Sequence, residues 1–103
     1  MEDWNKTEIE TFLAEKHTGY LYFYTPICGT CQLASKMLTV IEQLLPELRS
    51  GKADLNFLPE MAERFEIESV PCLILIKNGE VQEKIYAFQS VPYLFEKLTE
   101  LQG

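Results

Sequence analysis

Hydrophobic and polar positions along the first quarter of the chain predict a helix followed by a strand. Asn5 can cap a helix in which Glu8 stands three residues on, and apolar side chains then recur at helical spacing to about His17. After Gly19 comes an aromatic run, residues 20–24, without alternation of polar and apolar positions. Such a run is typical of a strand that is buried on both faces.

The longest helical pattern extends from Cys28 to about Leu48. Pro46 removes a backbone donor, so we expect it to bend or end this helix. Residues 50–51, Ser-Gly, are expected to form a turn before a short strand over residues 52–57. The apolar positions of the helix recur at spacings of three and four residues: Leu33, Met37, Val40, Ile41, Leu44, Leu45 and Leu48.

The second half predicts a short helix, a hairpin and a closing helix. Residues 59–65 look helical, with proline at the first helical position. Strands over 72–77 and 80–87 flank an Asn-Gly pair at 78–79, a strong signal for a two-residue hairpin turn. Ser90 is placed to cap the last helix. This order predicts one α/β domain over residues 1–103, with three layers: a central mixed sheet of about four strands between about four helices.

Composition and charge narrow the classes of partner. The hydrophobic fraction of 47% is enough for a packed core without a disulfide or metal staple. A net charge of -7 disfavours nucleic acid and anionic membrane surfaces. Residues 1–6 lack the basic start and apolar run of a signal peptide, and the longest apolar run, 72–76, is too short to span a bilayer. We therefore expect a cytoplasmic protein. We also expect it to be a monomer.

The three cysteines supply the candidate chemistry. An odd number argues against a secreted disulfide framework, and Cys28 and Cys31 form a C-x-x-C that opens a helix after a buried strand. The unpaired N–H groups and the dipole at a helix N-terminus favour a thiolate, which is the attacking species. Cys28, at the start, is expected to be the exposed nucleophile, and Cys31, one turn in, the shielded resolving thiol. Gly29 gives the first turn its backbone freedom.

A C-x-x-C is also half of many zinc sites. That interpretation needs two further ligands, and the only other soft ligands are Cys72 and His17. The position of the pair between strand and helix favours redox chemistry, and no metal or bound cofactor is expected.

Three segments resemble the thioredoxin family in order and spacing. They are residues 22–31 (Tyr-Phe-Tyr-Thr-Pro-Ile-Cys-Gly-Thr-Cys), residues 70–71 (Val-Pro) and residues 77–81 (Lys-Asn-Gly-Glu-Val). The resemblance covers nearly the whole chain and implies the thioredoxin fold. It also implies a thiol–disulfide oxidoreductase that reduces protein disulfides, with electrons from a reductase or small thiol that the sequence does not identify.

The resemblance also implies a substrate groove. Pro71 would follow a cis peptide bond, and the backbone of Val70 would pair with an extended substrate segment. Ile27, Gly29 and Thr30 would line the same groove around the cysteines.

Several positions depart from the family pattern. Ile27 and Thr30 stand where the family usually has tryptophan and proline, and Tyr22 stands where it has a buried acid that accepts a proton. Ala87 replaces a groove glycine, which predicts a narrower groove. These changes leave the redox potential open.

Cys72 replaces the threonine that usually follows the proline. It is interpreted first as a buried small apolar residue. The alternatives are a third redox thiol near Cys28 and Cys31, or a third ligand for a metal or iron–sulfur cluster. For the whole chain, metal or cluster binding is thus one alternative to the oxidoreductase function, and the other is a thioredoxin-like binding module with little turnover.

Overall fold

Four strands form one mixed sheet in the order β2-β1-β3-β4. The computed structural model describes residues 1–103. β1 pairs in parallel with β2 and antiparallel with β3, and β3 pairs antiparallel with β4. The elements are α1 (Lys6–Ala14), β1 (Gly19–Tyr24), α2 (Gly29–Leu44), β2 (Arg49–Asp54), a 3-10 turn (Leu55–Phe57), α3 (Pro59–Arg64), β3 (Cys72–Lys77), β4 (Glu80–Ile85) and α4 (Val91–Gln102).

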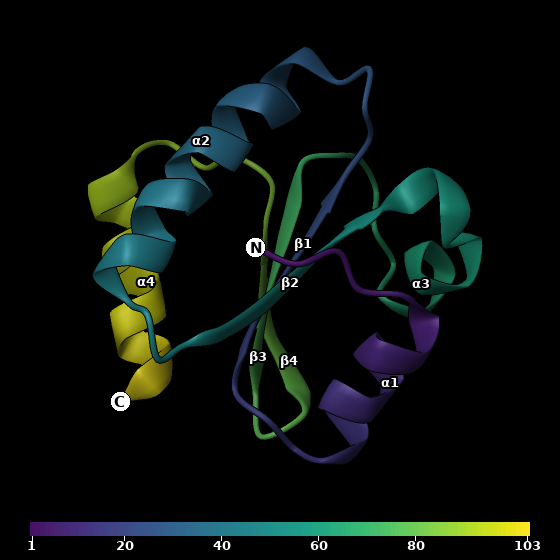
Figure 1. Cartoon of the computed structure of the whole chain (residues 1–103), viewed down its shortest axis with the longest axis horizontal. Coiled ribbons are helices and arrows are strands. Elements are labelled where there is room, and N and C mark those ends of the chain that lie inside the picture. The colour runs from purple at the N-terminus through teal and green to yellow at the C-terminus, as the bar shows by residue number, and fades with distance from the viewer.

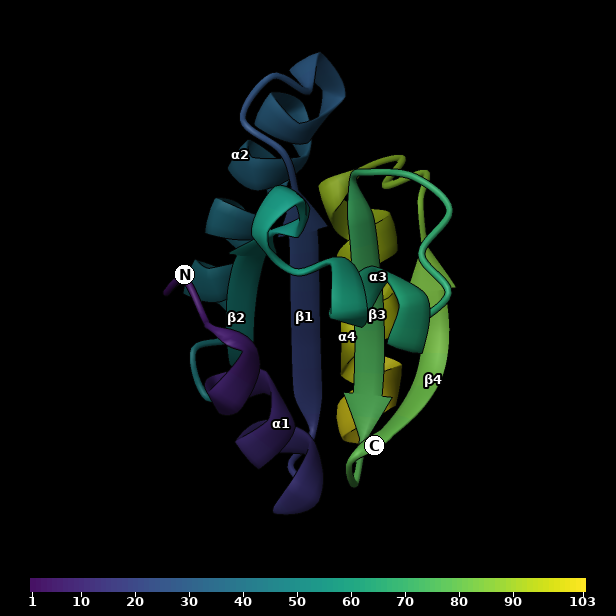
Figure 2. The same cartoon turned by 90° about the vertical axis from the view of Figure 1, so that its right-hand side faces the viewer.

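Helices cover both faces of this sheet, which confirms the predicted three layers. α2 and α4 lie side by side on one face, and α1 and α3 lie on the other (Figures 1 and 2). None of these helices combines the length and the apolar character that crossing a membrane requires.

The aromatic run of β1 is buried because successive side chains enter different cores. Tyr20 and Tyr22 pack with α2 and α4, whereas Leu21 and Phe23 pack with α1 and α3. Side chains alternate between the faces of a strand, so a strand covered on both sides must be apolar at every position. This confirms the prediction for residues 20–23, whereas Tyr24, at the end of the strand, is half-buried.

α1 begins as predicted but ends earlier. The Asn5 side chain accepts from the N–H of Glu8, and the Glu8 carboxylate accepts from the N–H of Asn5, which completes a capping box. The helix ends at Ala14, and Lys16 has a φ of 58°, a left-handed conformation that breaks the helical path before His17.

The predicted apolar stripe of α2 is partly wrong. The helix ends at Leu44, ahead of Pro46, and the side chains that reach the core are Ala34, Leu38, Ile41 and Leu45. Leu33, Val40 and Leu44 are exposed instead. Apolar side chains extend further around α2 than the part of its surface that packs on the sheet. The spacing of apolar residues alone therefore could not identify the buried side.

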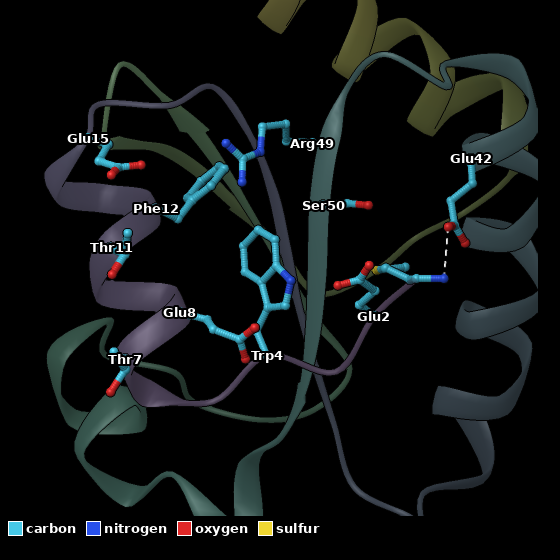
Figure 3. Close-up of a pocket in the computed structure, with 11 residues that line it drawn as sticks. Glu2, Trp4, Thr7, Glu8, Thr11, Phe12, Glu15, Glu42, Arg49 and Ser50 are labelled. Atoms are coloured by element: carbon cyan, nitrogen blue, oxygen red, sulfur yellow. Dashed lines mark ion pairs between the residues drawn. The ribbon is translucent and has the colours of Figure 1, made fainter.

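The turn predicted at Ser50 and Gly51 is also wrong. Both residues lie inside β2, where Gly51 pairs with Leu21 of β1. The Trp4 ring covers Gly51 so closely that a Cβ atom there would overlap it. Figure 3 shows this indole beside β2, in a surface hollow of about 530 Å³ between α1 and α2. Glycine is required here for close packing rather than for a turn.

The hairpin and the last helix are confirmed. Asn78 and Gly79 have φ values of 53° and 79°, as a two-residue turn between antiparallel strands requires. β4 ends at Ile85, two residues before the predicted end at Ala87. The Ser90 side chain accepts from the N–H of Tyr93 and caps α4.

Candidate active site

The cysteine pair lies where β1 passes into α2. Cys28 is the N-cap of α2, and its Sγ accepts from the N–H of Cys31 at 3.1 Å. A sulfur at an N-cap faces unpaired backbone N–H groups and the positive end of the helix dipole. This position favours negative charge on Cys28 when the pair is reduced.

The two sulfurs are joined in a disulfide, with the Cα atoms 5.2 Å apart. Cys28 is half-buried and Cys31 is only 3% exposed. The Thr30 hydroxyl lies 3.4 Å from the Sγ of Cys28. The sulfur that solvent can reach is therefore the one at the helix start.

The Val70–Pro71 segment stands beside this sulfur. The peptide bond between the two residues is cis, and the carbonyl oxygen of Val70 lies 3.9 Å from the Sγ of Cys28. Ile27 is 95% exposed, and a Cβ on Gly29 would meet no atom within 4 Å. The structure thus places Thr30 and Val70 close to the Cys28 sulfur and leaves open space at Gly29.

Tyr22 lies beneath the pair, where the family usually has an acid. Its O–H donates to the carbonyl of Cys31 at 2.8 Å, and its oxygen lies 3.1 Å from the Ser35 hydroxyl. The carbonyl can only accept, so the single phenolic proton goes to it and the Ser35 hydroxyl donates to Tyr22. Burial raises the pKa of Tyr22 above its ordinary value. The phenol is therefore a structural donor at neutral pH and not a base.

Sequence reasoning missed Ser35 and the wall of the groove on α2. Ser35 follows Cys31 by four residues, the spacing that puts two side chains on one helix face, so its position carried a usable signal. Leu33 and Met37 belong to the apolar pattern predicted for residues 28–48. Leu33 is exposed and Met37 packs partly against the core, and both line a hollow next to Thr30 and Pro71. Only packing could distinguish these two positions from core positions.

Cys72 is free and fully buried. Its side chain belongs to the core under α1 and α3, on the other side of the sheet from α2, which carries Cys31. Burial raises the pKa of the Cys72 thiol to about 11, although Tyr86 and Lys84 act in the opposite direction. These contacts favour the interpretation of Cys72 as a buried apolar residue.

The metal alternative lacks a ligand set in this fold. No three side chains of the types His, Cys, Asp or Glu come together in the structure. Cys28 and Cys31 are paired with each other, and Cys72 lies under the opposite helices. The three cysteines do not converge on one point, so this alternative is not favoured.

Comparison with known proteins identifies the family. The thioredoxin family model matches residues 2–100. The chain belongs to the thioredoxin family. A thioredoxin-like protein of Bacillus subtilis, YusE, is 51% identical over 80 residues, covering 78% of this chain and 76% of that protein. The thioredoxin of the same organism is 30% identical over 87 residues, covering 82% of this chain and 84% of that one.

A solved thioredoxin structure matches the whole fold. Oxidised mitochondrial thioredoxin 3 from Saccharomyces cerevisiae superposes with a TM-score of 0.85 at 25% identity, covering 97% of this chain and 94% of that one. The family, its C-x-x-C pair and the geometry described above agree. This thioredoxin-like protein is a thiol–disulfide oxidoreductase.

Proposed function

We propose that this protein reduces disulfides in other proteins, with Cys28 as the nucleophile and Cys31 as the resolving thiol. The observation that carries the proposal is the position of the Cys28 sulfur. It caps α2, is the more exposed of the pair and lies next to the Val70 carbonyl. A thiolate so placed can attack a disulfide carried on an extended segment.

In the first step the Cys28 thiolate attacks one sulfur of the substrate disulfide. A bond forms between Cys28 and that sulfur, the substrate S–S bond breaks, and the other substrate sulfur leaves as a thiolate. The main chain of Val70, together with Ile27, Gly29 and Thr30, would hold the substrate segment. This arrangement is supported by the exposure of Ile27 and by the open space at Gly29.

In the second step the Cys31 thiolate attacks the Cys28 sulfur of the mixed disulfide. The Cys28–Cys31 disulfide forms, and the second substrate sulfur leaves as a thiolate, so two electrons have passed to the substrate. Cys31 must lose its proton before this step. Because Tyr22 donates its proton to a carbonyl, we propose that solvent accepts the proton from Cys31.

The cycle closes when an external dithiol or a reductase reduces the Cys28–Cys31 disulfide by the reverse exchange. We place the protein in a reducing compartment, the cytoplasm. The buried free thiol of Cys72 fits a compartment in which unpaired cysteines persist. We also propose that residues 1–103 act as one domain, since both cysteines and the groove residues belong to one sheet and its helices.

Insulin reduction with dithiothreitol as the electron donor tests this function. Cys28→Ser is expected to lower the rate to that of dithiothreitol alone, because no nucleophile remains. Cys31→Ser is expected to accumulate a mixed disulfide between Cys28 and an insulin chain, visible as an added mass.

Cys72→Ala is the matched control and is expected to retain turnover, since that thiol is buried away from the pair. Full insulin reduction by Cys28→Ser would refute the assignment of the nucleophile. A mixed disulfide or a second disulfide that includes Cys72 would revive its redox role.

A further inference from the structure

Helix α2 carries two apolar stripes with the same spacing. The core stripe is Ala34, Leu38, Ile41 and Leu45, all buried. The outer stripe is Leu33, Met37, Val40 and Leu44, displaced from the first by one residue, or by about 100° around the helix. Its members Leu33, Val40 and Leu44 are 59%, 42% and 50% exposed.

A single exposed leucine is ordinary on a protein surface, but here three exposed apolar side chains, with the partly buried Met37 between them, follow one helix face. Other exposed positions of α2 are polar, for example Gln32, Lys36 and Gln43. The apolar stripe is therefore not simply the solvent-facing side of the helix. A strip of this kind marks a surface that a partner covers at least part of the time.

The outer stripe begins at the disulfide. Its first two members, Leu33 and Met37, form one wall of a hollow of about 280 Å³, large enough for one bulky apolar side chain. Thr30, between the two cysteines, and Pro71 form the end of the hollow nearest the pair. The opposite wall is the segment after β4: Tyr86, Ala87, Phe88 and Gln89.

We propose that the outer stripe docks an apolar segment of the protein whose disulfide is being reduced. The hollow would take the side chain closest to the reacting cysteine, and Val40 and Leu44 would contact the segment beyond it. Leu33 and Leu44 are eleven positions apart, which is roughly 16 Å along a helix and about five residues of extended chain.

Continuity with the redox site favours a substrate over a second copy of this chain as the occupant, because any segment bound at Val70 must leave the site past one of its walls. The inference rests on the proposed function and specifies its substrate class: protein segments with bulky apolar residues near the disulfide. Small disulfides, which never reach Val40 or Leu44, would gain nothing from the stripe.

Two synthetic disulfide peptides test the inference. They differ only in that one carries three leucines within about five residues of its disulfide and the other carries serines. The wild-type protein is expected to reduce the leucine peptide with a kcat/KM roughly tenfold higher than that for the serine peptide. The difference should come from a lower KM, because the stripe strengthens binding and does not change the chemical step. The double variant Val40→Gln/Leu44→Gln is expected to lose most of this preference, and glutamine keeps the helix propensity high.

Val81→Gln on β4 is the matched control, because Val81 is 44% exposed, close to the value for Val40, and lies outside the stripe. It is expected to keep the full preference. Reduction of bis(2-hydroxyethyl) disulfide is expected to be the same in the double variant and the wild type.

Equal reduction of both peptides by the wild type would overturn the docking surface while leaving the oxidoreductase intact. A change from dimer to monomer in the double variant on gel filtration would assign the stripe to a second copy and also overturn it. Failure to reduce any of the three disulfides would instead refute the proposed function.

Discussion

Cys28 serves the fold and the chemistry with the same atom. Its sulfur accepts the N–H of Cys31 and so caps α2, and the same sulfur is the one that faces solvent. A group that satisfies a helix terminus by accepting a hydrogen bond does so better when it is negatively charged. The cap that holds the first turn of α2 would therefore also stabilise a thiolate at Cys28 once the disulfide is reduced.

Tyr22 shows how one substitution changes the site without disturbing the fold. Its phenol fills the space beneath the pair and joins the Cys31 carbonyl to Ser35. A carboxylate at this position would be a titrating group in the core. With Tyr22 no buried side chain carries a charge, so the pair lies over a wholly uncharged interior.

The buried thiol of Cys72 is expected to lower the free energy of unfolding at alkaline pH. Burial raises its pKa from 9.0 to about 11, so the folded protein holds a proton that the unfolded chain releases above pH 9. The free energy of unfolding should therefore fall as pH rises from 9 to 11, with a share of roughly 2 kcal/mol from this thiol. Urea denaturation of the oxidised protein at several pH values measures it.

Cys72→Val is the control, because it keeps an apolar side chain in the core and removes the proton. Its stability should decline less steeply over the same pH range. Identical slopes for the variant and the wild type would mean that the decline belongs to the tyrosines, whose pKa values are also raised by burial.

At the scale of elements, the edge of β2 depends on a segment far away in the sequence. Residues 2–4 run alongside β2, where the N–H of Trp4 donates to the Lys52 carbonyl at 2.8 Å and the N–H of Lys52 donates to the Glu2 carbonyl at 2.9 Å. The indole of Trp4 then covers Gly51 (Figure 3). The segment thus shields an edge strand that would otherwise offer unpaired backbone groups.

Gly51→Ala tests this contact. The new Cβ would overlap the Trp4 ring, so we expect a loss of about 1–3 kcal/mol in the free energy of unfolding. In a Trp4→Ala background the same substitution should cost much less, because the overlapping ring is gone. Additive effects in this double-mutant cycle would show that the two residues are not coupled.

At the scale of the molecule, two cores on opposite faces of one sheet hold the site between them. Tyr22, in the core under α2 and α4, donates to the Cys31 carbonyl, and the core under α1 and α3 contains Cys72 at the start of β3. Both cores contribute to the site through β1 and β3, the central strands.

The oxidised protein is predicted to be more stable than the reduced one. A disulfide that closes the short loop between Cys28 and Cys31 restricts the unfolded chain by about 2 kcal/mol at 25 °C. Urea denaturation of both forms measures the difference. A reduced form of higher stability would indicate that the helix dipole stabilises the Cys28 thiolate by more than this, and the disulfide would then act as an oxidant.

Local patterns determined much of this protein. The capping box of α1, the Asn78–Gly79 hairpin and the Ser90 cap depend on residues a few positions apart, so the sequence contains the whole interaction. The cysteines at the start of α2 were identifiable for the same reason, because strand, turn and helix follow one another directly.

Tertiary structure decided what depends on distant neighbours. Gly51 looked like a turn residue until Trp4 was found against it, and the two apolar stripes of α2 were indistinguishable until the sheet covered one of them. Likewise Tyr22 and Ser35 are thirteen residues apart and meet only because α2 packs over β1. Burial and close approach are properties of the packed molecule, whereas periodicity records only that a residue could be buried.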